Sequence, residues 1–500
     1  MTNKSRSVYL PLIIIFLIGL VLRFYRVGES SLWNDEAGQL LAALQPTFAD
    51  MMEIIRSHAM AMPLDYLVTR IVSHFSISEG ILRLPSVIWG TFTIPIIFLF
   101  ARKLLCNLYS GNRSALFLSL LLAVSPIHIF YSQEMRFYSS LGFFYWLATY
   151  IMLLYIESPR MKLWIVMVLV LIIGELFHPF VLLSFVNGIS MLIASVIFTR
   201  GIIPGWKESL RRQGLAFGIA GLLAGIAIGI YFIVLNPSSY YTYDLLWRTS
   251  SIGEFFLQAM GWKSLAFCVG TSTFSMWEML LIFLSAVGLW SMSRRFPKSW
   301  IMVSLLVSLF FQIVIIVFLN ITRGYFLVFR QAIHLAPILM IFAAIGMDHI
   351  LAMVPSWESG SRRWVTVVSG ICICLVALPS ILQLSQVDKS NARHVVEAIL
   401  TSGFEPRNVQ VAPFYETKVY QVYFDYYYHV PGQFIIPAAL DRLEESEKTD
   451  MANFLITPLN DIDDDSLLLR GYKPLLTPQI ECDGSRAVLF REIPKPSSPP

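Results

Sequence analysis

Charged residues are scarce in this sequence. Asp, Glu, Lys and Arg together make up only 14% of its 500 residues, compared with about 25% in soluble globular proteins. Hydrophobic residues make up 56%, and the mean hydropathy is +0.65. Such a composition requires lipid as the solvent for much of the chain. The net charge of +4 is small and does not indicate nucleic acid as a partner.

Common motifs for nucleotides and metals are also missing. The sequence has no Walker A motif, no Gly-rich dinucleotide motif and no zinc motif, so nothing supports a nucleotide-driven reaction. None of the five cysteines forms a metal-ligand set with histidines. Cys372 and Cys374 lie in an apolar run, which is typical of small apolar filler. No small-residue cleavage site follows the first apolar run, and this predicts an uncleaved first span.

Long apolar runs predict about eleven transmembrane helices, each of which needs about 20 residues. They lie at residues 8–25, 84–104, 114–132, 137–157, 162–177, 179–199, 214–235, 275–293, 299–320, 331–353 and 364–384. Basic residues support this count, because short cytoplasmic loops are rich in Lys and Arg. With the N-terminus in the cytoplasm, every predicted inside loop is basic. We therefore expect a multi-pass protein of the plasma (inner) membrane.

Two segments outside the predicted spans are long enough to contain secondary structure of their own. In the first outer segment, 26–83, helical periodicity at 49–55 and 63–75 predicts interfacial helices. After Ser385 the composition becomes polar and mixed. We expect helices there at 391–400 and 417–428 and strands at 409–412, 452–456 and 486–490. An aspartate-rich loop at 461–465 lacks an EF-hand pattern and is more typical of a solvated loop than of a calcium site.

The expected fold class is therefore mainly α. We predict a polytopic membrane helix bundle at residues 1–385, with interfacial helices in its first outer loop. A small extracytoplasmic α/β domain is expected at residues 386–500.

Polar residues gather at the predicted outer ends of the spans. Asp35 and Glu36 follow the first span, and a carboxylate there can act as a general base or hold a cation. An ordinary helix start, with Asn34 or Asp35 as N-cap, is an equal alternative. Glu134 and Arg136 lie in the short loop between two apolar spans, either as a functional pair or as a local anchor.

Other residues at the predicted outer ends of the spans also have two possible interpretations. Arg330 lies at the outer end of a late span, where it suits an anion site or an interface anchor. His58 lies between the predicted interfacial helices, where a solvated histidine is the commoner case, and His178 lies at a tight turn. Arginine binds phosphate bidentately, so carboxylates and arginines at a lipid boundary suit a substrate with a phosphate head and a lipid tail.

Three motifs resemble those of the GT-C membrane glycosyltransferases. They are Leu-Trp-Asn-Asp-Glu-Ala (32–37), Leu-Arg-Leu-Pro-Ser (82–86) and Tyr-Ser-Gln-Glu-Met-Arg-Phe-Tyr (131–138). The match is best to the family-39-like group, relatives of protein O-mannosyltransferases and of lipid A aminoarabinose transferases. His178 resembles the histidine that follows the fifth span in that group. Arg330 and Pro337 resemble its late Arg/Tyr…Pro helix.

This resemblance implies a membrane enzyme that moves a sugar from a polyprenyl-phosphate-linked donor to an acceptor on the outer side. The acceptor is a glycan, a lipid or a protein, and in-line attack would invert the anomeric configuration. The resemblance places catalytic carboxylates at Asp35 and Glu36. It places donor-phosphate binding at Glu134, Arg136 and Arg330. We expect a substrate pocket at His58, Tyr138, His178 and Tyr325. Some relatives use a divalent metal near these carboxylates, so a metal is left open.

Two other classes of membrane protein remain as alternatives. A lipid-linked polysaccharide flippase or transporter would carry charges within several spans, whereas here they concentrate at one face. An O-antigen ligase or polymerase would centre its chemistry on a large late outer loop, whereas the carboxylates here follow the first span. The charge distribution therefore favours the glycosyltransferase.

Overall fold

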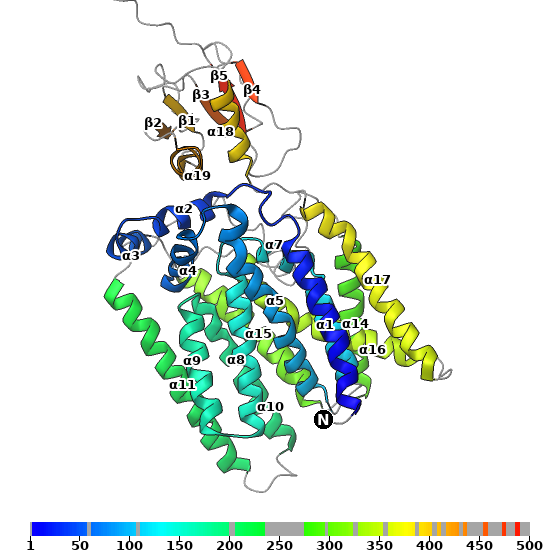
Figure 1. Cartoon of the computed structure of the whole chain (residues 1–500). Coiled ribbons are helices and arrows are strands. Elements are labelled where there is room, and N and C mark those ends of the chain that lie inside the picture. Colours follow the sequence, from blue (N-terminus) through cyan, green and yellow to red (C-terminus); the bar gives the residue numbers. More distant parts are fainter. Residues whose placement is uncertain are drawn as a thin grey trace, which may run out of the picture. The chain divides into compact units, whose positions relative to one another are not determined.

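A computed structural model describes most of the helical part of the chain and shorter pieces of the C-terminal part (Figure 1). The described residues are 3–57, 62–106, 111–199, 206–235, 275–295, 299–323, 329–353, 359–385, 390–402, 408–411, 417–429, 434–437, 454–458, 473–476 and 486–490. They form two compact units. The helical unit comprises Met1–Tyr25, Met52–Asp65 and Leu84–Leu384, and the α/β unit comprises Arg26–Met51, Tyr66–Arg83 and Ser385–Pro500.

Long apolar helices build the helical unit. They are α1 (Asn3–Phe24), α5 (Glu79–Leu104), α6 (Gly111–Ala123), α7 (Pro126–Ser132), α8 (Tyr138–Glu157), α9 (Met161–Glu175), α10 (Ser184–Thr199), α11 (Trp206–Leu235), α14 (Met276–Arg295), α15 (Trp300–Arg323), α16 (Ala336–Met353) and α17 (Ser359–Ser385). The 3-10 helices η1 (Pro179–Leu183) and η3 (Phe329–Leu335) lead into α10 and α16. Helix α5 begins in the α/β unit and continues into the helical unit.

Each of the predicted spans lies on a helix or on a bent helix pair. Eight helices in the described part of the chain are long and apolar enough to cross a membrane. The pair α6 and α7 adds a ninth if it is one span, bent by 56° where Pro126 begins α7. The apolar part of α1, Val8–Phe24, and helix α9, of 15 residues, are shorter than that length. Helix α9 ends early because His178-Pro179 turns the chain.

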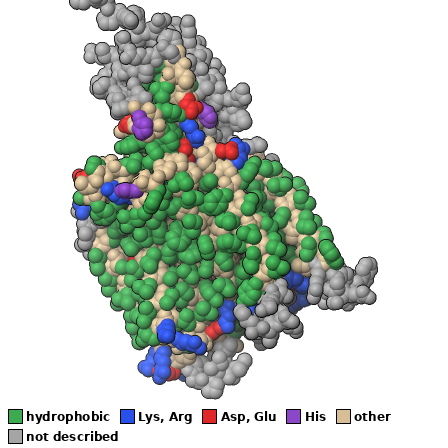
Figure 2. All heavy atoms as spheres, viewed as in Figure 1, with side chains coloured by type: hydrophobic (Ala, Val, Ile, Leu, Met, Phe, Trp, Pro, Cys, Tyr) green, Lys and Arg blue, Asp and Glu red, His purple; other side chains and the backbone are tan. Residues whose placement is uncertain are grey.

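Small residues bring the two most tightly packed helices of the core together. Helix α16 is buried along almost its whole length, and α14 packs against it. A Cβ atom on Gly288 would overlap the carbonyl oxygen of Phe342, and one on Gly346 would overlap that of Leu284. In lipid the hydrophobic effect does not drive helices together. Helices associate instead through van der Waals contacts, which small residues permit by letting the two backbones approach closely. Helices α11 and α17 instead expose many apolar side chains, and Figure 2 shows such a hydrophobic surface.

A buried polar network also ties the helices of this unit together. Tyr145 on α8 donates to the side chain of Gln312 on α15 (2.8 Å). Asn187 on α10 donates to Tyr145 (2.7 Å) and to Thr149 (3.1 Å). Gln312 in turn donates to Asn187 (3.1 Å). Satisfied polar groups between membrane helices contribute to their packing, and this network fixes three helices relative to one another.

The α/β unit combines helices near the first span with the C-terminal part of the chain. Its helices include α2 (Asn34–Ala43), most of α4 (Pro63–Ser73), part of α3 (Phe48–Ser57), α18 (Ala392–Thr401), α19 (Thr417–Val422) and the π-helix η5 (Tyr423–Tyr427). The interfacial helices predicted at 49–55 and 63–75 correspond to α3 and α4.

A five-stranded sheet completes this unit. Its strands are β1 (Asn408–Val411), β2 (Phe434–Pro437), β3 (Phe454–Pro458), β4 (Lys473–Leu476) and β5 (Arg486–Phe490), in the order β2-β1-β3-β5-β4. Strand β1 pairs in parallel with β2 and β3, whereas β5 pairs antiparallel with β3 and β4. The sheet lies within residues 386–500, where the sequence predicted a small α/β domain, but the compact unit also includes Arg26–Met51 and Tyr66–Arg83, which the prediction assigned to the membrane domain. Strands β2 and β4 were not predicted. The aspartate-rich loop 461–465 lies outside the described residues.

Candidate active site

Glu36 forms a buried ion pair with Arg83. Both side chains are almost fully buried. The Nε and Nη2 atoms of Arg83 donate to the two carboxylate oxygens of Glu36 at 2.9 and 2.7 Å. The backbone N–H of Trp33 also donates to Glu36 (3.3 Å), as in a capping box in which Trp33 is the N-cap. The structure therefore corrects the alternative in which Asn34 or Asp35 caps the helix, and both oxygens of Glu36 are occupied within the fold.

Arg83 also holds the segment that leads into α2. It donates to the carbonyl oxygens of Val27, Ser30 and Ser31 at 2.9–3.0 Å. A guanidinium has five N–H donors in a fixed fork, so one buried arginine can pair a carboxylate and order a loop at once. Arg83 lies in the Leu-Arg-Leu-Pro-Ser motif, yet its role was not predicted, because nothing in the sequence links that motif to Glu36.

Helix α2 is held along its whole length. In its middle, the Gln39 side chain donates to Thr69 of α4 (2.8 Å). At its C-terminal end, Arg70 donates to the carbonyl oxygens of Ala43 (2.9 Å) and Gln45 (2.6 Å). Terminal carbonyls of a helix have no partner within the helix, so a cation there satisfies them and complements the helix dipole. Asp35, in the first turn of α2, is thus carried on a fixed element.

Asp35 and Glu36 face in different directions although they are neighbours. Successive residues of a helix project about 100° apart. Glu36 is fully buried against Arg83, whereas Asp35 is partly exposed. The structure therefore separates two carboxylates that the sequence places together. Asp35 keeps part of its surface exposed, and Glu36 fixes the helix that carries it.

The helical unit brings together another group of the predicted residues. Arg136 and Tyr138 flank Phe137, whose ring stacks on the imidazole of His178 at a centroid distance of 4.2 Å. The guanidinium of Arg136 lies 5.4 Å from the Phe137 ring centroid. The guanidinium of Arg330 lies 5.8 Å from the Tyr138 ring centroid. We call these five residues the arginine cluster, and the predicted residues Arg136, Tyr138, His178 and Arg330 all belong to it.

His178 is a buried, neutral member of this cluster. Its Nδ1 accepts a hydrogen bond from the backbone N–H of Phe180 (3.2 Å), so the ring proton is on Nε2. That Nε2 atom is buried and has no hydrogen-bond partner among the described residues. Burial lowers the pKa of His178 well below its usual value, and the nearby His334 and Arg136 lower it further. His178 therefore presents a neutral N–H donor beside Arg136.

Glu134 is buried in the loop that carries Arg136, two residues before it. Glu175 lies three residues before His178 and is also buried, and neither of its carboxylate oxygens has a partner among the described residues. The described residues contain no group of three or more His, Cys, Asp or Glu side chains that could hold a metal ion. The predicted residues His58 and Tyr325 lie outside the described residues.

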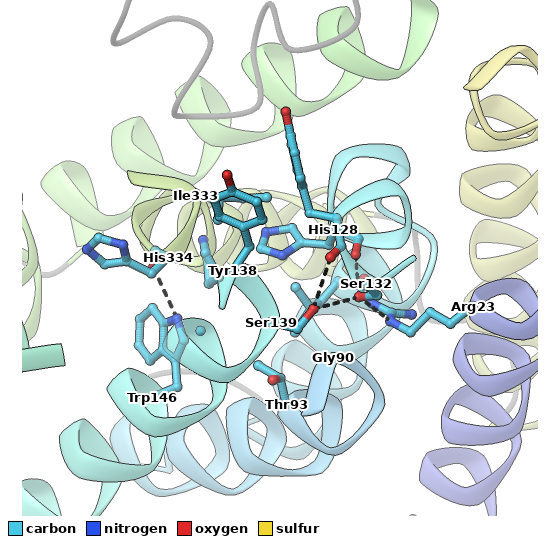
Figure 3. Close-up of a pocket in the computed structure, with 14 residues that line it drawn as sticks. Arg23, Gly90, Thr93, His128, Ser132, Tyr138, Ser139, Trp146, Ile333 and His334 are labelled. Carbon is cyan, nitrogen blue, oxygen red and sulfur yellow. Dashed lines mark hydrogen bonds between the residues drawn. The ribbon is translucent and has the colours of Figure 1, made fainter. Parts of the chain in front are cut away.

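A small cavity lies in the helical unit beside Tyr138 (Figure 3). It has a volume of about 20 Å³, which is room for one water molecule. Arg23, His128, Ser139 and His334 are among its lining residues. The buried Arg23 donates to Ser132 (3.2 Å) and to the carbonyl oxygens of Gly19, Leu122 and Ala123. Tyr138, which also lines this cavity, was predicted for the substrate pocket. Arg23, His128 and His334 were not predicted, because they come from helices that only tertiary packing brings together.

Comparisons with known proteins agree with this architecture. No protein-family model and no curated protein sequence matches the chain. ArnT from Cupriavidus metallidurans in the apo state superposes with a TM-score of 0.57 at 12% identity, over 98% of both chains. The same protein bound to undecaprenyl phosphate gives 0.54 at 14% identity, again over 98% of both chains.

A second protein has a similar structure. The oligosaccharyltransferase of Archaeoglobus fulgidus, in complex with Zn and sulfate, gives a TM-score of 0.54 at 12% identity. The match covers 95% of this chain and 73% of the oligosaccharyltransferase. The chain therefore has the same polytopic helical fold as these two proteins, which is the fold that its motifs predicted.

Proposed function

We propose that this protein is a membrane glycosyltransferase that takes its sugar from a polyprenyl-phosphate-linked donor. The arginine cluster on a GT-C fold is the observation that carries the proposal. Two guanidinium groups and a neutral imidazole N–H suit a phosphate that gains negative charge as it leaves. ArnT, whose structure was solved with undecaprenyl phosphate, has the same fold. This supports a lipid phosphate as the leaving group here.

The proposed reaction is a single displacement at the anomeric carbon. The acceptor hydroxyl oxygen forms a bond to that carbon, and the bond from the carbon to the phosphate oxygen breaks. The lipid phosphate leaves with the electron pair, which Arg136 and Arg330 stabilise. Asp35 accepts the proton of the acceptor hydroxyl. Attack opposite to the leaving group inverts the anomeric configuration.

The remaining predicted residues in the described part of the chain have narrower roles in this proposal. Glu36 is a positioning residue, because its ion pair with Arg83 fixes the helix that carries Asp35. Glu134 orients Arg136, and Tyr138 and His178 line the donor pocket. Whether a divalent metal takes part near the carboxylates is left open.

We further propose that the reaction takes place on the outer side of the plasma (inner) membrane. The N-terminus would then be cytoplasmic and the C-terminal domain extracytoplasmic. Basic predicted inside loops support this orientation. The acceptor would be a glycan, lipid or protein on that side.

The decisive test is sugar transfer by purified protein in nanodiscs. Labelled polyprenyl-phosphate sugars are supplied as donors. In a separate experiment, mass spectrometry compares the surface glycans and lipids of a deletion strain with those of the wild type, and the missing species identifies the natural product. Asp35→Asn keeps the size of the side chain but removes its basicity. We expect turnover to fall by about 10²–10⁴-fold with donor binding retained.

Two outcomes would contradict the proposal. Wild-type turnover in Asp35→Asn would show that Asp35 is not the base. Movement of intact lipid-linked sugar across the membrane, with no transfer to any acceptor, would identify a flippase instead.

A further inference from the structure

The C-terminal part of the chain is anchored at the segment that carries Asp35. Tyr423, at the start of η5, accepts a hydrogen bond from the backbone N–H of Leu32 (2.7 Å). The same hydroxyl donates to the carboxylate of Glu79 (2.9 Å), which also pairs with Arg393 of α18 (2.8 Å). Burial raises the pKa of Tyr423, and the charge of Glu79 raises it further, so the phenol stays a neutral donor. Leu32 lies three residues before Asp35.

This anchor sets α19 against α2. Helix α19 runs directly into η5, and it packs on α2 within the α/β unit. The Cδ atom of Lys418, near the start of α19, lies 3.8 Å from the position that a Cβ atom on Gly38 would take. The aliphatic part of Lys418 therefore passes close to Gly38.

The position of Gly38 identifies what the lysine faces. Residues three apart in a helix lie on the same face, so Gly38 and Asp35 share one side of α2. A lysine stem that crosses Gly38 brings its ammonium into the field of Asp35. Partial burial lowers the pKa of Lys418, and the charge of Asp35 acts in the opposite direction. Glu36, the other acid in this turn, is already paired with Arg83.

We propose that Lys418 is a positioning residue for the carboxylate of Asp35. This inference rests on the proposed function, in which Asp35 takes the proton of the acceptor hydroxyl. The attraction of an ammonium restricts the directions in which a neighbouring carboxylate points, so that the carboxylate is held ready to accept the proton. The C-terminal domain thereby contributes a side chain to the acceptor side of the reaction.

The kinetic test uses full-length protein in nanodiscs and compares Lys418→Met with Lys418→Arg. We expect kcat of Lys418→Met to fall by about tenfold with donor affinity unchanged, because the lysine acts on the base and not on the donor. Lys418→Arg should restore most of the activity. Gln421→Met, at an exposed position of α19, is the matched control.

A second measurement tests the placement of Lys418 without any catalysis. The rate at which an amine-reactive reagent modifies Lys418 is followed by mass spectrometry in the wild type and in Asp35→Asn. Loss of the negative charge lowers the pKa of the ammonium, so modification near neutral pH should become about threefold faster. Lys162, an exposed residue of α9, should react equally in both proteins.

These two measurements separate the possible failures. Equal modification of Lys418 in both proteins would overturn the inference, because the two side chains would not interact. Normal kcat in Lys418→Met, in an enzyme that Asp35→Asn inactivates, would also overturn it. A wild-type protein that transfers no sugar from any polyprenyl donor would refute the proposed function instead. In that case the modification rates alone would test whether Lys418 lies beside Asp35.

Discussion

The buried ion pair of Glu36 with Arg83 leads to a prediction that distinguishes a structural role of Glu36 from a role in the reaction. The perturbations are Arg83→Met, which removes the cation, and Glu36→Gln, which removes the anion. Arg83 makes two hydrogen bonds to Glu36 and three to backbone carbonyl oxygens, all at 2.7–3.0 Å. Either change therefore leaves one charge buried without its partner.

The expected cost follows from the burial of this pair. Breaking a buried ion pair by removing one partner destabilises a protein by about 3–5 kcal/mol. Arg83→Met also leaves three backbone carbonyl oxygens without a donor, so its cost should lie at the upper end of that range. Glu36→Gln keeps an acceptor for Arg83 and should lie at the lower end. Changing both residues to apolar ones of similar volume should cost less than the two single changes together.

Thermal unfolding of the purified protein in detergent is the assay. Arg212→Met is the control, because its ion pair with Glu208 is largely exposed and surface pairs contribute little. The control should unfold like the wild type, whereas both Glu36→Gln and Arg83→Met should unfold at clearly lower temperature. A Glu36→Gln protein with wild-type stability and no turnover would refute this reasoning, since Glu36 would then act in the reaction itself.

Three further predictions concern the helical unit. Arg136→Met and Arg330→Met should each weaken binding of polyprenyl-phosphate sugar in a folded protein, and unchanged affinity in both would exclude them from the donor site. Gly288→Ala should lower the unfolding temperature, because its Cβ would overlap a backbone oxygen of α16. Gly214→Ala, which meets no atom within 4 Å, should not. Reporter fusions near residues 110, 205 and 297 should read as cytoplasmic and fusions after 390 as external; a cytoplasmic C-terminal domain would contradict the topology.

The helical architecture was largely predictable because it depends on local composition. A long apolar run has few options in lipid other than a helix, so every predicted span lies on a helix or a bent pair. Helix lengths were less predictable. The 56° bend between α6 and α7 and the short α9 depend on Pro126 and on the His178-Pro179 turn, and hydropathy averages over such local features.

The candidate site was predictable only in part. The segment 136–138 and His178 were identified by motif, and the structure places these residues together with Arg330. The environment of each charge was not predictable. Glu36 is separated from Arg83 by 47 positions, and Tyr423 is separated from Leu32 by 391. Contacts over such distances arise from tertiary packing, which leaves no periodic pattern in the sequence.

The two neighbouring carboxylates show why a simple activity screen would mislead. Asp35 and Glu36 share a helix turn, so variants of either are expected to lose activity. Glu36 has both oxygens occupied by Arg83 and by the N–H of Trp33, and its loss acts through the fold. Asp35 is partly exposed on a helix held at both ends, and in the proposed mechanism its loss acts through the proton. Measuring stability as well as turnover distinguishes these causes. A variant of Glu36 is expected to lose the position of helix α2, whereas a variant of Asp35 is expected to keep it.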